Sequence, residues 1–336
     1  MELRDRSAAI VECVPNVSEG LRPDVITRIS EAICRAGCVR LLHVDSSADA
    51  NRTVFTFAGP PDAVGDAAFS MISEAIRLID MRRHTGAHVR NGAVDVVPFV
   101  PIRGVDMDTC VALARALADR VGRELQIPCY LYGEAATMPQ RRNLSFLRRG
   151  QYEALRDKLS SPGWTPDTGP SEWTSRTAAA GSVQIGARPF LIALNLNLDT
   201  RDVRIARRIA RSIRTSGVPG TRQRGLFDGL LADGWLMDAY GCAQVTMNVT
   251  DFRRAPLHEV FLSCASLARK EGTRVIGSEL IGLIPLEALV AAGRGLLAAE
   301  DADADTAVDI AVERLGLSSV GPFIKEERII ERLLAE

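Results

Sequence analysis

The clearest indication of the fold comes from residues 38–79, which read CVRLLHVDSSADANRTVFTFAGPPDAVGDAAFSMISEAIRLI. Apolar residues dominate two short segments, 38–44 and 53–58, and the polar loop 45–52 separates them, a pattern typical of two strands. From 61 to 79, apolar residues recur every three or four positions, which predicts a helix with one buried stripe. This stretch therefore predicts a strand–strand–helix unit.

The flanking segments extend this pattern in both directions. On the N-terminal side we expect a strand at 8–14 and a helix at 23–37, which has a proline at its start and a glycine at its end. On the C-terminal side we expect a strand at 93–100, a helix at 106–125 and a strand at 127–131. The first half of the chain is therefore expected to have the order β-α-β-β-α-β-α-β.

The second half of the chain repeats the same order of elements. The expected elements are a strand at 188–198, a helix at 201–214, strands at 226–237 and 243–249, a helix at 256–270 and a strand at 273–276. Both halves contain β-α-β-β-α-β, the split unit of ferredoxin-like folds. We therefore expect an α+β fold made of two ferredoxin-like α/β sandwich subdomains.

A polar connection joins the two halves. Residues 160–186 contain three prolines and several glycine, serine and threonine residues, which predicts irregular structure. A loop of this length in a folded protein is usually functional. We expect residues 1–180, including this connection, to form the N-terminal subdomain and residues 181–336 to form the C-terminal subdomain.

Composition excludes several classes of protein. The 336 residues include 41 basic and 42 acidic side chains, a net charge of −1 that argues against a nucleic-acid-binding protein. Charges alternate in residues 1–6, where a secretory signal would be apolar, and no later segment has the apolar length of a membrane helix. We expect a cytoplasmic protein without membrane contact. The seven cysteines form no C-x-x-C pair, so we interpret them as buried free thiols.

Two histidines stand four residues apart in the loop RRHTGAHVRNGAVD at 82–95. On a helix, His84 and His88 could bind a metal, but the glycines indicate a loop and the expected site has no metal. An imidazole near arginines can serve as a general acid or base at neutral pH, since neighbouring positive charges keep it unprotonated. The alternative, a surface histidine without a catalytic role, is equally compatible with this pattern.

Arginines and one aspartate complete the candidate site. Arg52, Arg90 and Arg188 could bind carboxylates through the paired geometry of the guanidinium group, although solvated surface charge is the usual role of an arginine. Asp45 lies at the end of a predicted strand, where it could hold a cationic substrate, orient a base or simply form a turn. No glycine-rich phosphate loop is present, so nothing supports a nucleotide cofactor.

Several segments, taken together, resemble glutamate formimidoyltransferase, the first domain of the formimidoyltransferase-cyclodeaminase family. The first is VECVPNVSEG at 11–20. The others lie at 44–45, 51–57, 88–101, 130–136, 186–193, 244–248 and 277–285. They occur in the family's order over nearly the whole chain, which makes the resemblance specific.

The resemblance implies two subdomains with a groove between them, tetrahydrofolate as co-substrate, small-molecule substrates and a homodimer. The reaction would move a formimidoyl group from N-formimidoyl-L-glutamate to N5 of tetrahydrofolate. The catalytic histidine of the family falls on His88, and an acidic active-site residue falls on Asp45. The folate-binding stretch and its continuation fall on Gly169, Pro170, Ser171, Glu172, Trp173 and Gly181. Both substrates carry glutamate carboxylates, which Arg52, Arg90 and Arg188 are expected to bind.

The sequence also departs from the family at the proposed base. The family pattern His-Pro-Arg-Met-Gly is replaced by HVRNG at 88–92. This departure leaves the histidine in place and changes residues beside it. The alternatives are therefore a folate-dependent formyl or formimidoyl transfer with a different amine donor or acceptor, and a non-catalytic folate-binding homologue.

Overall fold

The computed structural model describes residues 9–335 and divides the chain into two units, Met1–Pro189 and Phe190–Glu336. The charged segment 1–6, on which the predicted cytoplasmic location partly depends, lies outside the described residues. Each unit contains one β-sheet with its own buried core, and the fold is α+β. No helix within the described residues is long and apolar enough to cross a membrane.

The first unit is organised by a seven-stranded sheet. Its strands are β1 (Ile10–Cys13), β2 (Asn16–Val17), β3 (Arg40–Ser47), β4 (Arg52–Gly59), β5 (Val94–Arg103), β6 (Cys129–Gly133) and β7 (Val183–Ala187). Both β1 and β2 lie between β4 and β5, β3 pairs with the outer side of β4, and β7 and β6 continue the sheet beyond β5. The pairs of β7 with β5 and β6 are parallel, and the other pairs are antiparallel.

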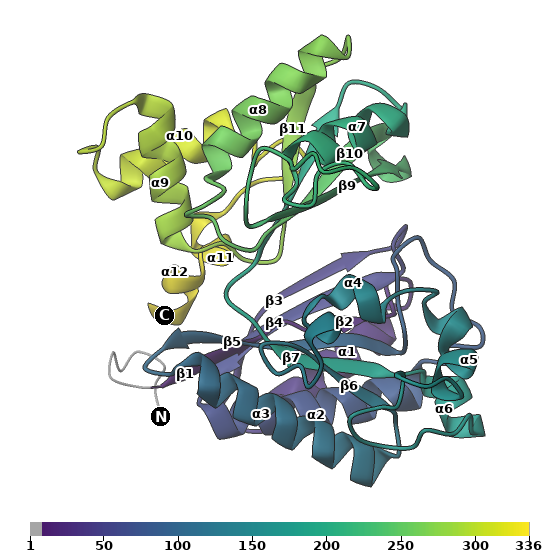
Figure 1. Cartoon of the computed structure of the whole chain (residues 1–336). Coiled ribbons are helices and arrows are strands. Elements are labelled where there is room, and N and C mark those ends of the chain that lie inside the picture. The colour runs from purple at the N-terminus through teal and green to yellow at the C-terminus, as the bar shows by residue number, and fades with distance from the viewer. Residues whose placement is uncertain (1–8, 336) are drawn as a thin grey trace. The chain divides into compact units, whose positions relative to one another are not determined.

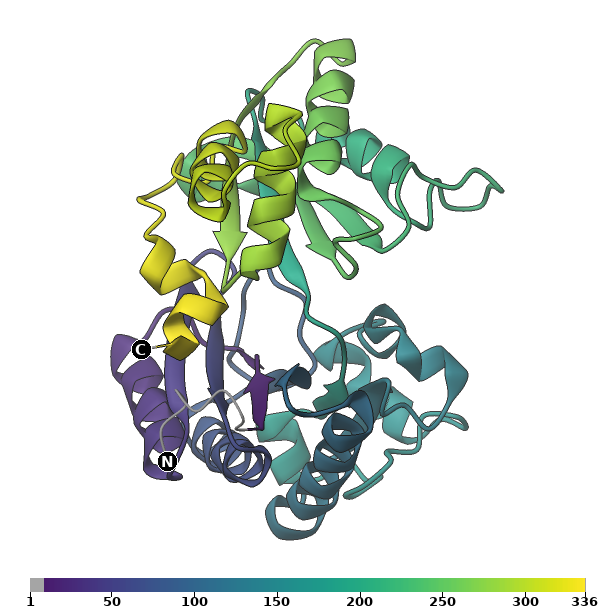
Figure 2. The same ribbon diagram turned by 90° about the vertical axis from the view of Figure 1, so that its left-hand side faces the viewer.

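Three helices cover one face of this sheet (Figures 1 and 2): α1 (Pro23–Arg35), α2 (Pro61–Leu78) and α3 (Met107–Arg120). Apolar side chains at helical spacing, such as Ile29 of α1 and Met71 of α2, are fully buried there against Phe55 and Phe57 of β4. The stripe expected from the sequence in 61–79 is therefore the stripe that packs on the sheet.

The opposite face of the sheet is covered over β5, β6 and β7 by short helical segments. These are η2 (Pro139–Arg142), α4 (Leu144–Leu147), η3 (Tyr152–Ala154) and α5 (Leu155–Leu159). The next helix, α6 (Ser175–Ala180), instead lines a pocket together with residues of α2, and its Ala180 belongs to the core on the helical face. Leu147, Leu155 and Leu159 pack with Tyr130 and Tyr132 of β6 in a second, smaller core. Beyond this cover, toward β4 and β3, the same face carries mostly polar side chains, and these form the candidate site.

The second unit contains a four-stranded antiparallel sheet. Its first elements are β8 (Ile192–Leu198), α7 (Val203–Ile213), β9 (Leu230–Met237), η4 (Asp238–Tyr240), β10 (Cys242–Val249), α8 (Leu257–Lys270) and β11 (Val275–Ile281). The strand order is β11-β8-β10-β9, and α7 and α8 pack on one face. The chain continues through α9 (Leu286–Leu297), α10 (Ala304–Arg314), α11 (Lys325–Arg328) and α12 (Ile330–Ala335).

Three features differ from the expectations. The predicted connection at 160–186 contains most of β7, because this segment pairs with β5 and β6 of the first unit. The predicted strand at 188–198 begins only at Ile192, after the end of β7. Along the chain, the boundary between the two units therefore falls after Pro189 rather than after residue 180. All seven cysteines are free, but Cys34 and Cys38 are exposed, so the prediction that they are buried was wrong.

Candidate functional site

The polar face of the first sheet follows from strand alternation. Since Phe55 of β4 points into the helical core, Arg52 and Val54 point to the opposite face. Asp45 of β3 pairs with Val54, so Asp45 and Arg52 are diagonal neighbours on that face, a relationship that separates Cα atoms by about 7–8 Å. The Asp45 carboxylate also lies 3.9 Å from Nε2 of His43. Two of the predicted site residues are thus adjacent on one surface.

Backbone hydrogen bonds hold His88 beside the turn between β3 and β4. The amide of Ala87 donates to the Asp49 carbonyl over 3.2 Å, and the amide of His88 donates to the Ala50 carbonyl over 3.4 Å. A Cβ atom at Gly86 would approach the Ala50 carbonyl oxygen to 2.5 Å, so the close approach of the two segments requires glycine there. The loop therefore brings His88 next to the start of β4.

The electrostatic environment keeps the His88 imidazole neutral. Burial lowers the pKa of His88 well below its usual range, and the positive charges of Arg52 and Arg148 lower it further. A neutral imidazole at pH 7 can accept a proton, and an imidazolium destabilised by cations readily returns it. His88 therefore has the protonation state that a general base needs.

Arg148 and Asp95 are two further residues of this site, which the sequence analysis did not single out as functional. Nε of Arg148 donates to Oδ2 of Asp95 over 3.0 Å, and Asp95 is almost completely buried on β5. Oδ1 of Asp95 accepts a hydrogen bond from the Asn91 amide over 2.9 Å, which secures the end of the loop that carries His88. Asp95 lies within residues 88–101, one of the segments that resemble the family, whereas no sequence pattern points to Arg148.

Arg90 is engaged within the protein. Its guanidinium donates to both Glu153 carboxylate oxygens, over 2.6 and 2.9 Å, and to Oε1 of Gln151 over 3.2 Å. Its Nε donates to Nδ1 of His84 over 3.3 Å. These contacts give Arg90 a role in holding the loop, and its contact with a substrate carboxylate stays a prediction.

Gly181 and Arg188 flank β7. Gly181 has φ of +75° and forms an isolated bridge with Gly92, and a Cβ atom on it would collide with the Asn91 carbonyl. It therefore allows the connection to pass directly beside the His88 loop. Arg188 follows β7 directly. Burial raises the pKa of Tyr132 to about 12, and the positive charge of Arg188 opposes this increase.

The predicted folate-binding stretch runs along the β6 edge of the sheet. The Cys129 amide donates to the Thr168 carbonyl over 2.9 Å. Gly169 has φ of +83°, and a Cβ atom on it would collide with the Ile127 carbonyl oxygen. Pro170, Ser171 and Glu172 follow at the surface. Trp173 contacts Tyr152, with ring centroids 6.1 Å apart, and the Tyr152 amide donates to the Arg90 carbonyl over 2.9 Å. The stretch therefore reaches the His88 loop through Tyr152 and Arg90.

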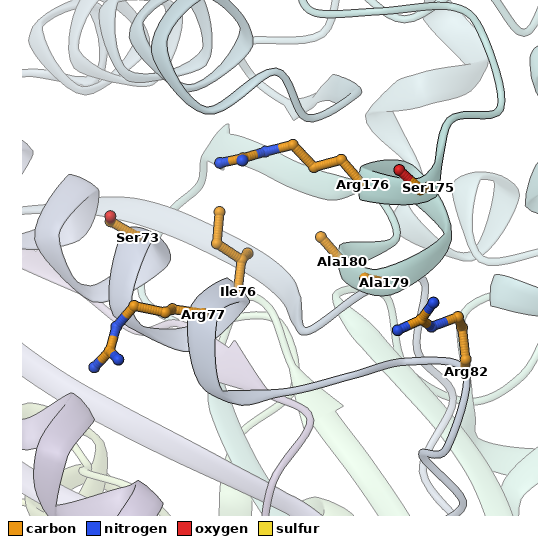
Figure 3. A pocket seen from close by; sticks show the side chains of 8 residues that line it. All are labelled: Ser73, Ile76, Arg77, Arg82, Ser175, Arg176, Ala179 and Ala180. Atoms are coloured by element: carbon orange, nitrogen blue, oxygen red, sulfur yellow. The ribbon is translucent and has the colours of Figure 1, made fainter.

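A pocket of about 580 Å³ lies at the end of α2 (Figure 3). Its lining consists of Ser73, Ile76, Arg77, Arg82, Ser175, Arg176, Ala179 and Ala180. Glu74 pairs with Arg77 and Asp80 pairs with Arg82, so two of the three positive charges are offset. None of the predicted site residues lines this pocket, which is therefore distinct from the candidate site.

The second unit also has a polar sheet face, opposite α7 and α8. Glu279 of β11 accepts hydrogen bonds from Asn195 over 3.1 Å, from Gln244 over 3.0 Å and from the Tyr240 hydroxyl over 2.7 Å. The Trp235 indole donates to Gln244 over 2.6 Å. The sequence indicated this network only indirectly, because Gln244 and Glu279 belong to the segments that resemble the family.

The structure offers no metal site in these surroundings. Both ring nitrogens of His84 are engaged, Nδ1 by Arg90 and Nε2 by the Asn51 carbonyl at 3.0 Å. Within residues 9–335, no three His, Cys, Asp or Glu side chains are grouped to hold a metal ion. The groups that this face offers for chemistry are the imidazole of His88, which is able to accept a proton, and the charges of Asp45 and the arginines.

Comparisons with known proteins identify the family of the chain. Residues 10–188 match the N-terminal subdomain of the formiminotransferase domain, and residues 193–335 match the formiminotransferase domain. Glutamate formimidoyltransferases from Streptococcus pyogenes serotype M1 and Thermoplasma acidophilum are each 40% identical, over 88% and 84% of this chain and 96% and 90% of their own. Formimidoyltransferase-cyclodeaminase from Rattus norvegicus is 44% identical over 97% of this chain, which spans 60% of that relative's length. The chain belongs to the formiminotransferase domain family.

Proposed function

We propose that this protein is a glutamate formimidoyltransferase, which transfers the formimidoyl group of N-formimidoyl-L-glutamate to N5 of tetrahydrofolate and releases glutamate. The observation that carries the proposal is the position of His88, which backbone hydrogen bonds from Ala87 and His88 hold beside the start of β4. Burial and the positive charges of Arg52 and Arg148 lower the pKa of this imidazole, which supports its role as a proton acceptor. The two relatives that carry this name align with the chain over nearly their whole length, which supports the same assignment.

The proposed reaction requires one group that first accepts and then donates a proton. N5 of tetrahydrofolate attacks the amidine carbon and loses its proton to His88, which gives a tetrahedral intermediate. The imidazolium then donates this proton to the glutamate nitrogen, and the bond between that nitrogen and the carbon breaks. Because Arg52 and Arg148 disfavour the imidazolium, they favour the second proton transfer and oppose the first to the same extent.

Asp45 is proposed to stabilise the formimidoyl group. This group is cationic in its reactive form, and a carboxylate on the same sheet face favours its binding and its positive charge. Asp45 reaches this face because β3 pairs with β4 in a register that places it opposite Val54. Arg52, its diagonal neighbour, is placed to bind a carboxylate of the same substrate.

Tetrahydrofolate is proposed to bind through residues of the connection and of the sheet. The aromatic ring of Trp173 can stack on a flat heterocycle, and Ser171 and Glu172 beside it are accessible. Buried Thr56 and Gln184, on β4 and β7, each have a side-chain oxygen without a hydrogen-bond partner inside the protein. Those oxygens can accept hydrogen bonds from a ligand such as the amino-substituted pterin ring.

We also propose that each unit is a ferredoxin-like sandwich. In the second unit the strand order β11-β8-β10-β9 supports it, because the first strand lies between the third and the fourth. The strands β3, β4, β1 with β2, and β5 have the same order in the first unit, and β7 and β6 extend it.

The family resemblance further favours a cytoplasmic homodimer. Light scattering on the purified protein tests whether it is a dimer.

A spectrophotometric assay tests the activity. Purified protein is incubated with tetrahydrofolate and N-formimidoyl-L-glutamate, and acid then converts 5-formimidoyl-tetrahydrofolate to the absorbing methenyl form. We expect turnover that falls by roughly two to four orders of magnitude in His88→Ala, while folate binding survives. The matched control is His258→Ala, on α8 of the second unit. Folate binding without turnover would redirect the proposal to another donor, and absence of folate binding would overturn it.

A further inference from the structure

His84 forms two directional contacts within the loop that carries His88. Its Nε2 lies 3.0 Å from the Asn51 carbonyl oxygen, and its Nδ1 lies 3.3 Å from Nε of Arg90. Since the guanidinium Nε always carries a hydrogen, it must donate to an unprotonated Nδ1. The remaining proton of the neutral ring is then on Nε2, which donates to Asn51. Both contacts therefore require one tautomer of the neutral ring.

Asn51 is the point at which three segments meet. It has φ of +44°, its Oδ1 accepts a hydrogen bond from the Gly20 amide over 2.9 Å, and its Nδ2 donates to the Thr85 carbonyl over 2.7 Å. It directly precedes Arg52, whose charge acts on the His88 ring. The contact between His84 and Asn51 therefore links the His88 loop to the start of the strand that carries Arg52.

Arg90 completes the linkage on the other side of the ring. Two hydrogen bonds to Glu153 and one to Gln151 fix its guanidinium, which is almost completely buried. The order of contacts is Glu153, Arg90, His84 and Asn51, and we refer to these four residues as the loop clamp. None of its contacts involves the imidazole of His88.

We propose that His84 is a positioning residue for His88, because the loop clamp holds the His88 loop where the imidazole can take the proton from N5. This inference rests on the proposed function, in which His88 transfers that proton. It assigns to the second histidine of the loop a role that does not require contact with either substrate. Misplacement of a catalytic group by about 1 Å can reduce turnover by about 100-fold.

The clamp also makes the loop sensitive to acid. The charged and titratable groups that act on His84 are Arg90 on the same loop, Glu153 of η3, Glu19 after β2, and His88. Burial lowers the pKa of His84, the positive charge of Arg90 lowers it further, and the Asn51 carbonyl and the two carboxylates oppose this effect. Protonation of Nδ1 would place its hydrogen against the Nε hydrogen of Arg90. The clamp is therefore intact only while His84 is neutral.

Two substitutions separate positioning from other roles. His84→Phe keeps a ring of similar size and removes both hydrogen bonds, and His84→Gln restores a donor that can reach the Asn51 carbonyl but does not titrate. We expect kcat of His84→Phe to fall by about 10- to 100-fold while KM changes little. We expect His84→Gln to recover most of kcat and to show a pH profile with one fewer ionisation on its acid side. The matched control is His258→Phe, with parental kinetics.

The outcomes distinguish this inference from the proposed function. Parental kcat in His84→Phe, a loss confined to KM, or an acid limb of His84→Gln identical to that of the parent would overturn the positioning role while the His88 assignment stands. If the parent has no turnover, hydrogen exchange still tests the clamp. The amides of Ala87 and His88, which donate to Asp49 and Ala50, should then exchange about tenfold faster or more in His84→Phe. Unchanged exchange would overturn the clamp itself.

Discussion

The guanidinium of Arg148 donates to the buried carboxylate of Asp95, with Nε 3.0 Å from Oδ2, and the same carboxylate accepts a hydrogen bond from the Asn91 amide. Through these contacts the segment after α4 is joined to the loop that carries His88. The pair has two effects, because it stabilises the end of the loop and leaves a positive charge that lowers the pKa of His88.

Replacement of Asp95 is expected to cost both stability and activity. In Asp95→Asn the partly buried guanidinium of Arg148, whose side chain is 19% exposed, loses its charge partner, which should lower the free energy of unfolding by about 3 kcal/mol or less. The side-chain amide still offers one oxygen, so the loop should form but be less ordered. Urea unfolding and kcat, measured together, check this result. The matched control is Glu287→Gln, which removes the partner of Arg253 in an exposed pair and should change little.

Replacement of Arg52 is expected to shift the pH dependence of the reaction. The positive charge of Arg52 lowers the pKa of His88, so Arg52→Gln should raise that pKa toward its ordinary value. His88 would then be protonated, and inactive as a base, at a higher pH. The acid limb of kcat/KM should move to higher pH, with Arg253→Gln as the control. A raised KM with an unmoved limb would mean that Arg52 contributes binding alone.

Gly181 is expected to tolerate no side chain. At φ of +75°, alanine is strained by about 1–3 kcal/mol, and its Cβ would also collide with the Asn91 carbonyl. Gly163→Ala is a matched control, because Gly163 has φ of +82° but nothing within 4 Å of an added Cβ. Thermal unfolding should show a larger loss for Gly181→Ala than for the control, and turnover should fall only in Gly181→Ala. Equal losses would show that the collision is relieved.

Lys158 is expected to make stability depend on pH in the alkaline range. Its Nζ is buried, donates to the Leu147 carbonyl over 2.8 Å and lies 4.5 Å from the centroid of the Trp164 ring. Burial lowers the pKa of Lys158 to about 8, below the value of about 10.4 in an unfolded chain. Between these values the unfolded state binds more protons, so stability should rise with pH from about 8 to about 10.4.

The variant Lys158→Met isolates this contribution. It keeps the length of the side chain and removes the ionisable group. The difference in unfolding free energy between parent and variant should therefore change across the same pH range, by up to about 3 kcal/mol. Denaturant unfolding at pH 7.5 and pH 10 measures this change. A difference that stays constant would show that Lys158 is not shifted.

Much of the fold could be predicted from the sequence because local periodicity reports which faces are buried. The stripe of α2 was visible without any structure, and it is part of the observed core. The strand β7 could not be predicted in the same way. It is five residues long, lies within a segment rich in turn-forming residues, and is stabilised by parallel pairing with β5 and β6, which are distant along the chain.

The candidate site divides along similar lines. The chemistry of side chains made His84, His88 and Asp45 candidates, because few residue types can transfer a proton or hold a cation at neutral pH. The family resemblance then selected His88 as the base and Asp45 as the acidic residue. The partners of those residues did not stand out, since Arg148 and Glu153 are ordinary charged residues until the chain folds. Arg90 was predicted to bind a substrate, and the structure shows that Glu153 already occupies its guanidinium.

By itself, the sequence determined most of the strands and the long helices, the buried face of an amphipathic helix such as α2, and the set of residue types available for chemistry. These properties depend on side-chain spacing and intrinsic reactivity, which are local. Only the tertiary structure decided the register that places Asp45 beside Arg52, the tautomer of His84 and the charges that keep His88 neutral. Those properties depend on contacts between residues far apart in the chain, and electrostatic effects at such contacts depend on burial and distance rather than on residue order.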